Sequence, residues 1–182
     1  MIMPLKRHQN PTVENDSRQM RVMSLSAEQQ HLDVHYMQNC LELVKNDYDQ
    51  SVDIPVAACI VNESQEVIAE STNQSISCND PTAHAEIAVI RQACLRQSNY
   101  RLSKCTLYVT LEPCLMCFAA CMHARVERIV FAASDYKVGI LSQAIYPKIH
   151  AAGNHHFCWT GGVLADTASQ RIQDFFRLNC RQ

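Results

Sequence analysis

Residues 106–117 read Thr106-Leu107-Tyr108-Val109-Thr110-Leu111-Glu112-Pro113-Cys114-Leu115-Met116-Cys117, and they pass from a strand pattern to a helix start. The first part is rich in β-branched and aromatic side chains, which is typical of a strand. Proline is favoured in the first turn of a helix, where its missing N–H has no partner to lose. We therefore expect a strand over 106–110 and a helix that Pro113 opens and that runs to about His123.

Strand and helix patterns continue to alternate on both sides of this stretch. A helix capped by Ser26 is expected to run to about Asp47, and further strands are expected over 56–61, 67–69, 128–132 and 157–160. The Asp80-Pro81-Thr82 segment is a helix-start signal, and that helix should reach about Leu95. A polar loop is expected over 134–156 and a last helix over 164–178. This order predicts an α/β protein in which helices flank a mixed sheet of five strands, a three-layer α/β/α domain.

Length and composition favour one globular domain. The chain has 182 residues, of which 47% are hydrophobic and 19% charged, and this excludes a disordered chain. Residues 1–25 show no periodicity and are expected to form a loose extension, so the domain is expected to cover 26–182. The N-terminus is polar and lacks the apolar stretch of a secretory signal, and no apolar run is long enough to span a bilayer. We therefore expect a cytoplasmic protein without a membrane segment.

The distribution of charge is uneven along the chain. The net charge of −2 does not by itself suggest a nucleic-acid partner. Residues 1–122 hold 9 Lys and Arg against 14 Asp and Glu, whereas residues 123–182 hold 7 against 4. The basic C-terminal third could meet phosphate, or it could be ordinary surface variation.

The ten cysteines do not indicate a disulfide scaffold, because the sequence shows no secretion signal. Cys59, Cys94 and Cys105 lie in apolar surroundings and are expected to be reduced thiols. Cys114 and Cys117 differ, since their spacing puts both thiols on one side of a helix, where the dipole at the N-terminus favours thiolate. Taken alone, this motif could be redox-active, half of a structural zinc site or without function.

His84-Ala85-Glu86 supplies the remaining parts of a candidate metal site. His84 would be a third ligand, and a Cys2His set leaves one zinc position open for water. Residues two positions apart in a regular helix do not share a face. Glu86 can therefore reach the same ion only if His84 lies in an irregular first turn. Two alternatives remain: His84 could be a cap or surface residue, or Cys121 could close a structural site as a fourth ligand, which leaves Glu86 without a role.

His-x-Glu followed by Pro-Cys-x-x-Cys is the signature of the zinc deaminases. The strings at 79–87 and 106–117, with Asn99-Tyr100-Arg101-Leu102 and Asp174-Phe175-Phe176-Arg177, extend the similarity over about residues 27–181. On these residues the chain resembles the bacterial tRNA-specific adenosine deaminases, the TadA family of the cytidine deaminase-like superfamily.

This resemblance implies a homodimer that hydrolytically deaminates the wobble adenosine of a tRNA anticodon stem-loop to inosine. It implies one Zn²⁺ per subunit, bound by His84, Cys114 and Cys117, and a zinc-bound hydroxide with Glu86 as the catalytic proton shuttle. It also places substrate contacts at Asn73, Asp135, Asn154, Phe176 and Arg177.

Some of these substrate residues have structural alternatives. Asn73 could stabilise a turn and Asp135 could cap a loop. Phe175 and Phe176 are adjacent on a helix, so one of them is expected in the core and the other at the surface.

The chain departs from the family pattern at two places. Ala57 stands where the family commonly has Gly, and the loop 138–142 lacks the usual run of small residues. Both changes concern the base pocket and the substrate loop. Two other functions are therefore kept as alternatives: a zinc deaminase of a free base or nucleotide, such as cytosine, a cytidine nucleotide or guanine, and a non-catalytic zinc-binding interaction module.

Overall fold

The structure, a computed structural model, describes residues 25–44, 52–143 and 146–179, so the expected extension lies outside the described residues except for Leu25. Within these ranges the chain forms five strands and five helices. Their bounds in chain order are α1 Ala27–Leu43, β1 Ala57–Val61, β2 Val67–Thr72, α2 Ala85–Gln97, β3 Thr106–Leu111, α3 Leu115–Ala124, β4 Arg128–Ala133, α4 Tyr146–Ala152, β5 Cys158–Gly161 and α5 Ala165–Asn179.

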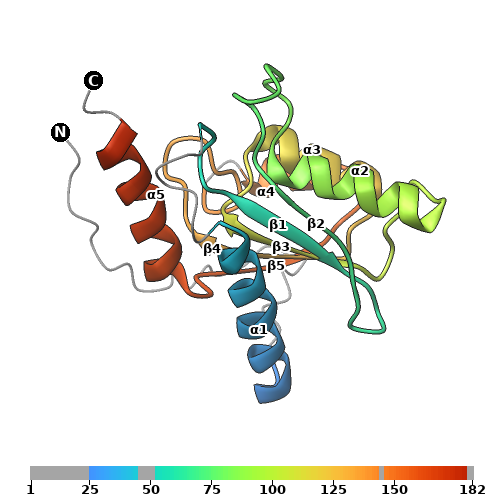
Figure 1. The fold of residues 1–182 in the computed structure, drawn as a ribbon. Helices are drawn as coiled ribbons and strands as arrows, with labels where there is room; N and C mark the ends of the chain where they lie inside the picture. Colours follow the sequence, from blue (N-terminus) through green and yellow to red (C-terminus); the bar gives the residue numbers. More distant parts are fainter. Residues whose placement is uncertain (1–24, 45–51, 144–145, 180–182) are drawn as a thin grey trace.

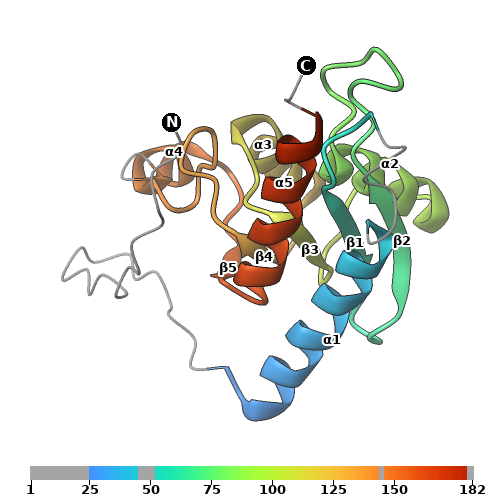
Figure 2. The same cartoon turned by 60° about the vertical axis from the view of Figure 1, so that its left-hand side comes forward.

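The strands form one mixed sheet in the order β2-β1-β3-β4-β5. β1 pairs antiparallel with both β2 and β3, whereas β3, β4 and β5 run parallel. Helices α1 and α5 cover one face of this sheet, and α2 and α3 cover the other (Figures 1 and 2). The expected three-layer α/β/α fold with a five-stranded mixed sheet is therefore confirmed.

Each face of the sheet has its own hydrophobic core. Along β1, Ala58 and Ile60 belong to the core beneath α2 and α3, whereas Ala57, Cys59 and Val61 belong to the core beneath α1. Successive strand residues point to opposite faces, so a strand buried on both faces needs a continuous apolar run. The Ala-Ala-Cys-Ile-Val sequence of β1 meets this need.

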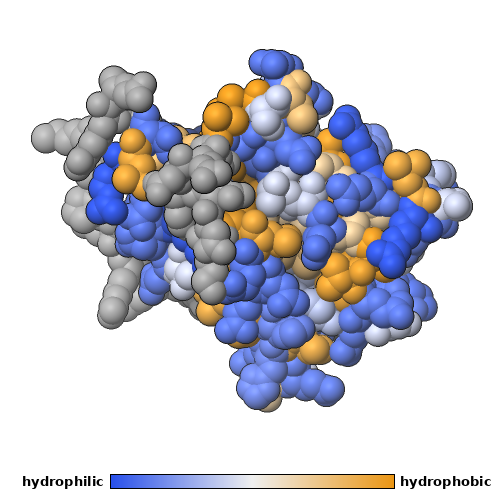
Figure 3. All heavy atoms as spheres, viewed as in Figure 1, coloured by the Kyte–Doolittle hydropathy of each residue, from blue (hydrophilic) through white to orange (hydrophobic). Residues whose placement is uncertain are grey.

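Helix α1 turns its polar side outward. In the space-filling view, hydrophilic residues cover most of the outer surface of α1 (Figure 3). The buried residues of α1 include Asp33, Tyr36, Met37, Cys40 and Leu41, which recur at helical spacing on the side facing the sheet. None of the helices in the described part of the chain combines the length and apolar character that crossing a membrane requires.

Several expected boundaries were wrong, and the largest error concerns α2. This helix begins at Ala85, not near Asp80. The Asp80 carboxylate accepts hydrogen bonds from the Thr82 N–H and hydroxyl at 2.8 and 2.7 Å, which folds 80–83 into a turn. An aspartate that bonds its own backbone two residues on favours such turns over a helix start.

The remaining differences are smaller. Pro113 precedes α3, whose N-cap is Cys114, and α1 ends at Leu43 with Val44 as its C-cap, while 45–51 lie outside the described residues. The expected loop 134–156 contains α4, a helix of 7 residues that is too short to give a clear periodic signal. Its first residue, Tyr146, packs edge-on against Phe118 of α3.

A buried ion pair fixes α1 to the sheet. Asp33 is 1% exposed, and its carboxylate accepts two hydrogen bonds from the Arg128 guanidinium, at 2.7 and 2.6 Å. The Tyr108 hydroxyl donates a further bond to Asp33 at 3.0 Å. One side chain of α1 is thus bonded to both β3 and β4.

We expect Asp33→Asn to lower the free energy of unfolding by about 3–5 kcal/mol, because it leaves the Arg128 guanidinium without its buried counter-charge. Urea unfolding followed by circular dichroism measures this. The matched control is Glu63→Gln, which removes the carboxylate of the exposed ion pair with Lys104 and should leave the midpoint unchanged. Equal midpoints for the two variants would contradict the role given to Asp33.

Candidate functional site

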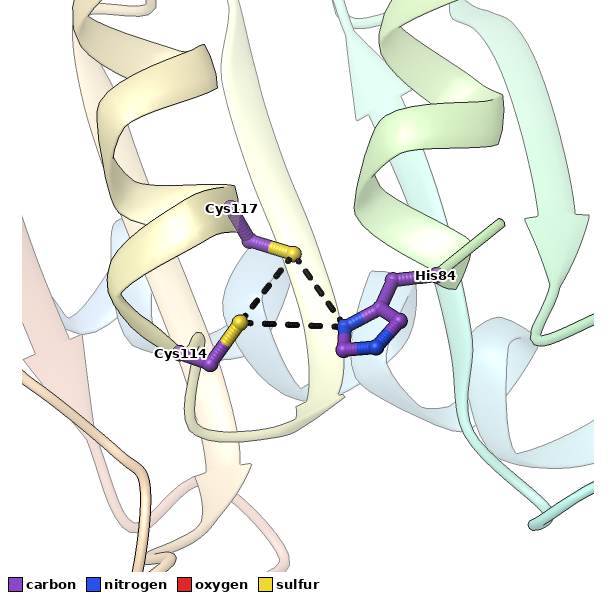
Figure 4. Close-up of side chains that lie close together, drawn as sticks. All are labelled: His84, Cys114 and Cys117. Atoms are coloured by element: carbon purple, nitrogen blue, oxygen red, sulfur yellow. Dashed lines mark hydrogen bonds between the residues drawn. The ribbon is translucent and has the colours of Figure 1, made fainter. Parts of the chain in front are cut away.

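Three side chains meet where two helices begin. His84 is the N-cap of α2, Cys114 is the N-cap of α3, and Cys117 lies in the first turn of α3. The His84 Nδ1 atom lies 3.7 Å from the Cys114 Sγ and 3.5 Å from the Cys117 Sγ, and the two sulfurs are 3.7 Å apart (Figure 4). Among the described residues these three form the group of His, Cys, Asp and Glu side chains close enough to share a metal ion.

Local backbone conformation explains why the side chains converge. His84 and Cys114 both have extended backbones, with φ/ψ of −68/151° and −74/172°, and in the described structure neither side chain caps its own helix. Each side chain is therefore free to turn toward the other helix. The unpaired N–H groups of both helix starts face the same region, and they favour negative charge on the sulfurs.

The electrostatics of the set favour one thiolate, at Cys114, whereas the hydrogen bond with Cys114 and burial raise the pKa of Cys117. Hydrogen bonds from Cys117 and from His84 lower the pKa of Cys114 to about 4. The hydrogen bond to Cys114 in turn raises the pKa of His84. A thiolate is the form of cysteine that binds metal ions.

The geometry of this donor set fits zinc. Tetrahedral zinc with Zn–S bonds of about 2.3 Å and Zn–N bonds of about 2.0 Å requires donor atoms separated by about 3.5–3.8 Å. The three observed distances of 3.5–3.7 Å lie in that range. Three protein donors leave one position of a tetrahedron for another ligand.

The alternative of a closed site with Cys121 does not agree with the structure. Cys121 is fully buried in the core beneath α2 and α3, and burial raises the pKa of its thiol. It does not belong to the group of side chains that could share an ion. The donor set among the described residues is therefore open.

Glu86 lies beside these donors. It is in the first turn of α2, two residues after the N-cap His84, and is 4% exposed. Glu86 can share a site with His84 only if His84 lies outside the regular helix. The extended backbone of His84 at the N-cap meets this condition. Burial raises the pKa of Glu86, and the neighbouring Cys114 sulfur raises it further, whereas His84 lowers it. The glutamate is thus held in a dry position within electrostatic reach of all three donors.

Asn73 and Asp135 both take part in local backbone structure. The Asn73 N–H donates to the Val56 carbonyl, and its Oδ1 accepts from the Ser75 hydroxyl at 3.1 Å. The Asp135 Oδ1 accepts from the N–H groups of Lys137 and Val138, at 2.9 and 3.2 Å. Asp135 therefore caps its loop, and a contact of either residue with substrate stays a prediction.

The other three predicted substrate residues lie at the surface. Asn154 is exposed, and the Arg125 guanidinium donates to its Oδ1 and its carbonyl oxygen. Phe175 is 5% exposed and belongs to the core, whereas Phe176 is 40% exposed. Arg177 is exposed and forms an ion pair with Asp174 of the same helix turn. Phe176 is thus the exposed ring of the pair, and a contact of these three residues with substrate stays a prediction.

Two features near the site bear on its shape. Ala57 is fully buried, and its N–H donates to the Thr110 hydroxyl. Glu112, which the sequence reasoning missed, is buried and bonded to the loop that starts at Asp135. A signal for it existed in the sequence, since a lone acidic residue at the end of a buried strand needs hydrogen-bond donors nearby.

Comparisons with known proteins agree with this site. Residues 30–133 match the family described as the cytidine and deoxycytidylate deaminase zinc-binding region. The chain is 46% identical to a tRNA-specific adenosine deaminase of Haemophilus influenzae over 69% of this chain and 72% of that one.

Two solved structures extend the comparison. A deaminase that edits adenosine 34 at the wobble position of tRNA superimposes with a TM-score of 0.70 at 35% identity, covering 75% of this chain and 98% of the other. A guanine deaminase of Bacillus subtilis superimposes with a TM-score of 0.52 at 34% identity, covering 60% and 66%.

We expect Cys117→Ala to lose bound zinc, from about one ion per chain to near zero, because two donors cannot hold the ion as three do. Metal analysis of the purified protein measures this, and the thermal midpoint should fall with the metal. Cys121→Ala is the matched control, since it removes a nearby buried thiol outside the donor set. Full zinc occupancy in Cys117→Ala would point to a different set of ligands.

Proposed function

The chain belongs to the family of tRNA-specific adenosine deaminases, and we propose that it hydrolytically deaminates the wobble adenosine of a tRNA anticodon loop to inosine. The observation that carries this proposal is the buried carboxylate of Glu86 beside an open set of two sulfurs and one imidazole. A non-catalytic zinc-binding module would have no use for a carboxylate at that position.

The residues around the site divide the chemistry between them. His84, Cys114 and Cys117 would hold the zinc ion, and when bound the ion lowers the pKa of a water molecule so that a nucleophile exists near neutral pH. Glu86 accepts a proton from the attacking water and passes one to the purine ring nitrogen. It then takes the second proton from the hydroxyl group now on C6 and delivers it to the amino group, so that the C6–N bond breaks, ammonia leaves and the oxygen of water stays on C6 as the carbonyl.

The environment of Glu86 suits this double role. A carboxyl group whose pKa is raised by burial holds and releases protons closer to neutral pH than an exposed one does. Its place in the first turn of α2, next to the ligand His84, keeps it at the reacting end of the site.

We propose that the substrate contacts are those expected from the family resemblance. Asn73 would meet the flipped base, Asp135 the ribose and backbone of the target nucleotide, and Asn154, Phe176 and Arg177 the anticodon loop. The exposed ring of Phe176 and the exposed guanidinium of Arg177 have the chemistry for stacking on a base and for phosphate contact. A single-stranded anticodon loop lowers the cost of moving the base out of its stack.

We further propose an RNA-binding homodimer that works in the cytoplasm, with the deaminase domain covering 26–182. Exposed apolar side chains such as Leu95 and Leu115 offer surface that a second subunit would cover. Sedimentation that finds monomers alone would contradict the dimer, and recovery outside the cytoplasmic fraction would contradict the location.

A second candidate function is deamination of a free purine base, because a guanine deaminase shares 34% identity with the chain. The two functions use the same donors and the same glutamate, so only an assay of the substrates can distinguish them. We expect the purified protein to form inosine in a tRNA transcript with adenosine at position 34. A transcript with guanosine there, and free guanine, adenosine and cytidine, should give no product. Activity on free guanine alone would replace the tRNA proposal with the second candidate.

We expect Glu86→Gln to keep one zinc ion per chain while the rate of deamination falls by about a hundredfold to ten-thousandfold, because an amide cannot carry the proton. Single-turnover inosine formation and metal analysis of the same sample measure the two quantities. The control is Gln92→Glu on the same helix, outside the site. A Glu86→Gln protein with a rate near wild type would exclude the shuttle role.

A further inference from the structure

Glu112 is a buried carboxylate that the proposed chemistry does not use. It follows β3 directly and is 2% exposed. Its Oε2 accepts from the Asp135 N–H at 3.1 Å and from the Ser142 hydroxyl at 2.9 Å, and its Oε1 accepts from the Ser142 N–H at 2.6 Å. All three hydrogen bonds therefore go to the segment 135–142.

These hydrogen bonds fix both ends of the segment 135–142, here called the rim loop. Asp135 begins it and Ser142 ends it, and the two residues meet at one carboxyl group. Between them, the Ile140 N–H donates to the Pro113 carbonyl, and Gly139 forms an isolated bridge with Cys114. The rim loop is thus folded around Glu112 and placed against the backbone of a metal donor.

The space inside the rim loop is filled. A Cβ atom added at Gly139 would lie 2.5 Å from the Asp135 carbonyl oxygen and 2.6 Å from the Glu112 Cδ, so the loop closes directly on the carboxyl group. The tip of the rim loop points to solvent, since Tyr136, Lys137 and Val138 are exposed. An aromatic, a cationic and an apolar side chain are therefore presented together beside the site.

We propose that Glu112 is a positioning residue that holds the rim loop in the conformation that receives the nucleic-acid substrate. This inference rests on the proposed function, because it assigns the rim loop to the side of the site where the target nucleotide and its neighbours enter. Glu112 acts through the loop and not on the reacting atoms. Its loss should affect substrate binding more than the chemical step.

Glu112→Gln is a sharp test because its shape is nearly unchanged. The amide keeps one acceptor oxygen but replaces the other oxygen by an NH₂ group, which is a donor. That NH₂ group would face a backbone N–H or the Ser142 hydroxyl, where the carboxylate now offers an acceptor. At least one partly buried backbone hydrogen bond of the rim loop is lost, and this loss destabilises the local structure. Ser142→Ala is a milder variant, because it removes the hydroxyl bond and keeps the backbone bond.

We expect KM for the tRNA transcript to rise about tenfold in Glu112→Gln and two- to threefold in Ser142→Ala, while kcat stays within about threefold and zinc content is unchanged. Glu63→Gln is the matched control, since it makes the same chemical change at an exposed site. A fall in kcat at constant KM, a loss of zinc, or kinetics equal to those of the control would overturn the proposal. If Glu112→Gln does not fold, Ser142→Ala decides by the same criteria.

A second measurement separates this inference from the proposed function. Trypsin can cut after Lys137, at the exposed tip of the rim loop, and it cuts faster when a loop loses its fixed conformation. Cleavage there should be at least several times faster in Glu112→Gln than in Glu63→Gln. An equal rate refutes the positioning role even in an active enzyme. A wild-type protein that fails to deaminate tRNA would refute the proposed function but leave the cleavage result intact.

Discussion

The candidate metal site depends on the convergence of two helix N-termini, those of α2 and α3. The first residues of α2 and α3 bring His84 and Cys114 together across 30 positions of sequence, with Cys117 one turn further on. The sheet makes this possible because β1 and β3 are hydrogen-bonded neighbours whose shared face is covered by both helices. Two positive helix ends directed at one place would repel each other, and anionic sulfur relieves that repulsion. The same place therefore favours a thiolate at Cys114 and suits a metal ion.

Buried carboxylates do the remaining positioning. Asp33 bonds α1 to β3 and β4, Glu112 bonds the rim loop to the end of β3, and Glu86 lies dry beside the donors. Two of the three have full sets of donors around them, as buried charges require. Glu86 differs, because its neighbours are the metal donors themselves. A buried acid in such surroundings is suited to chemistry more than to structure.

Much of the fold was predictable from sequence because its strands are short apolar runs, Ser26 marks the start of α1, and α5 carries a clear amphipathic pattern. The convergence of His84, Cys114 and Cys117 was predictable because the His-x-Glu and Pro-Cys-x-x-Cys motifs contain these residues. The start of α2 was wrong because a turn made by the Asp80 side chain precedes it, and α4 was missed because it is too short for its pattern to be read. The position of Glu112 after an apolar strand indicated that it needs donors, but its partners could not be predicted because they lie 23 and 30 residues further along the chain.

The ion pair between Asp33 and Arg128 joins residues 95 positions apart. During synthesis on the ribosome, α1 emerges before β4, so its guanidinium partner does not exist until β4 has been made. The β1–β2 hairpin can close meanwhile, because its strands are adjacent in sequence. The apolar side of α1, which includes Met37 and Leu41, is therefore fully buried only after the sheet is complete. The nascent chain therefore exposes the apolar side of α1 during that interval, and transiently exposed apolar surface of this kind favours aggregation.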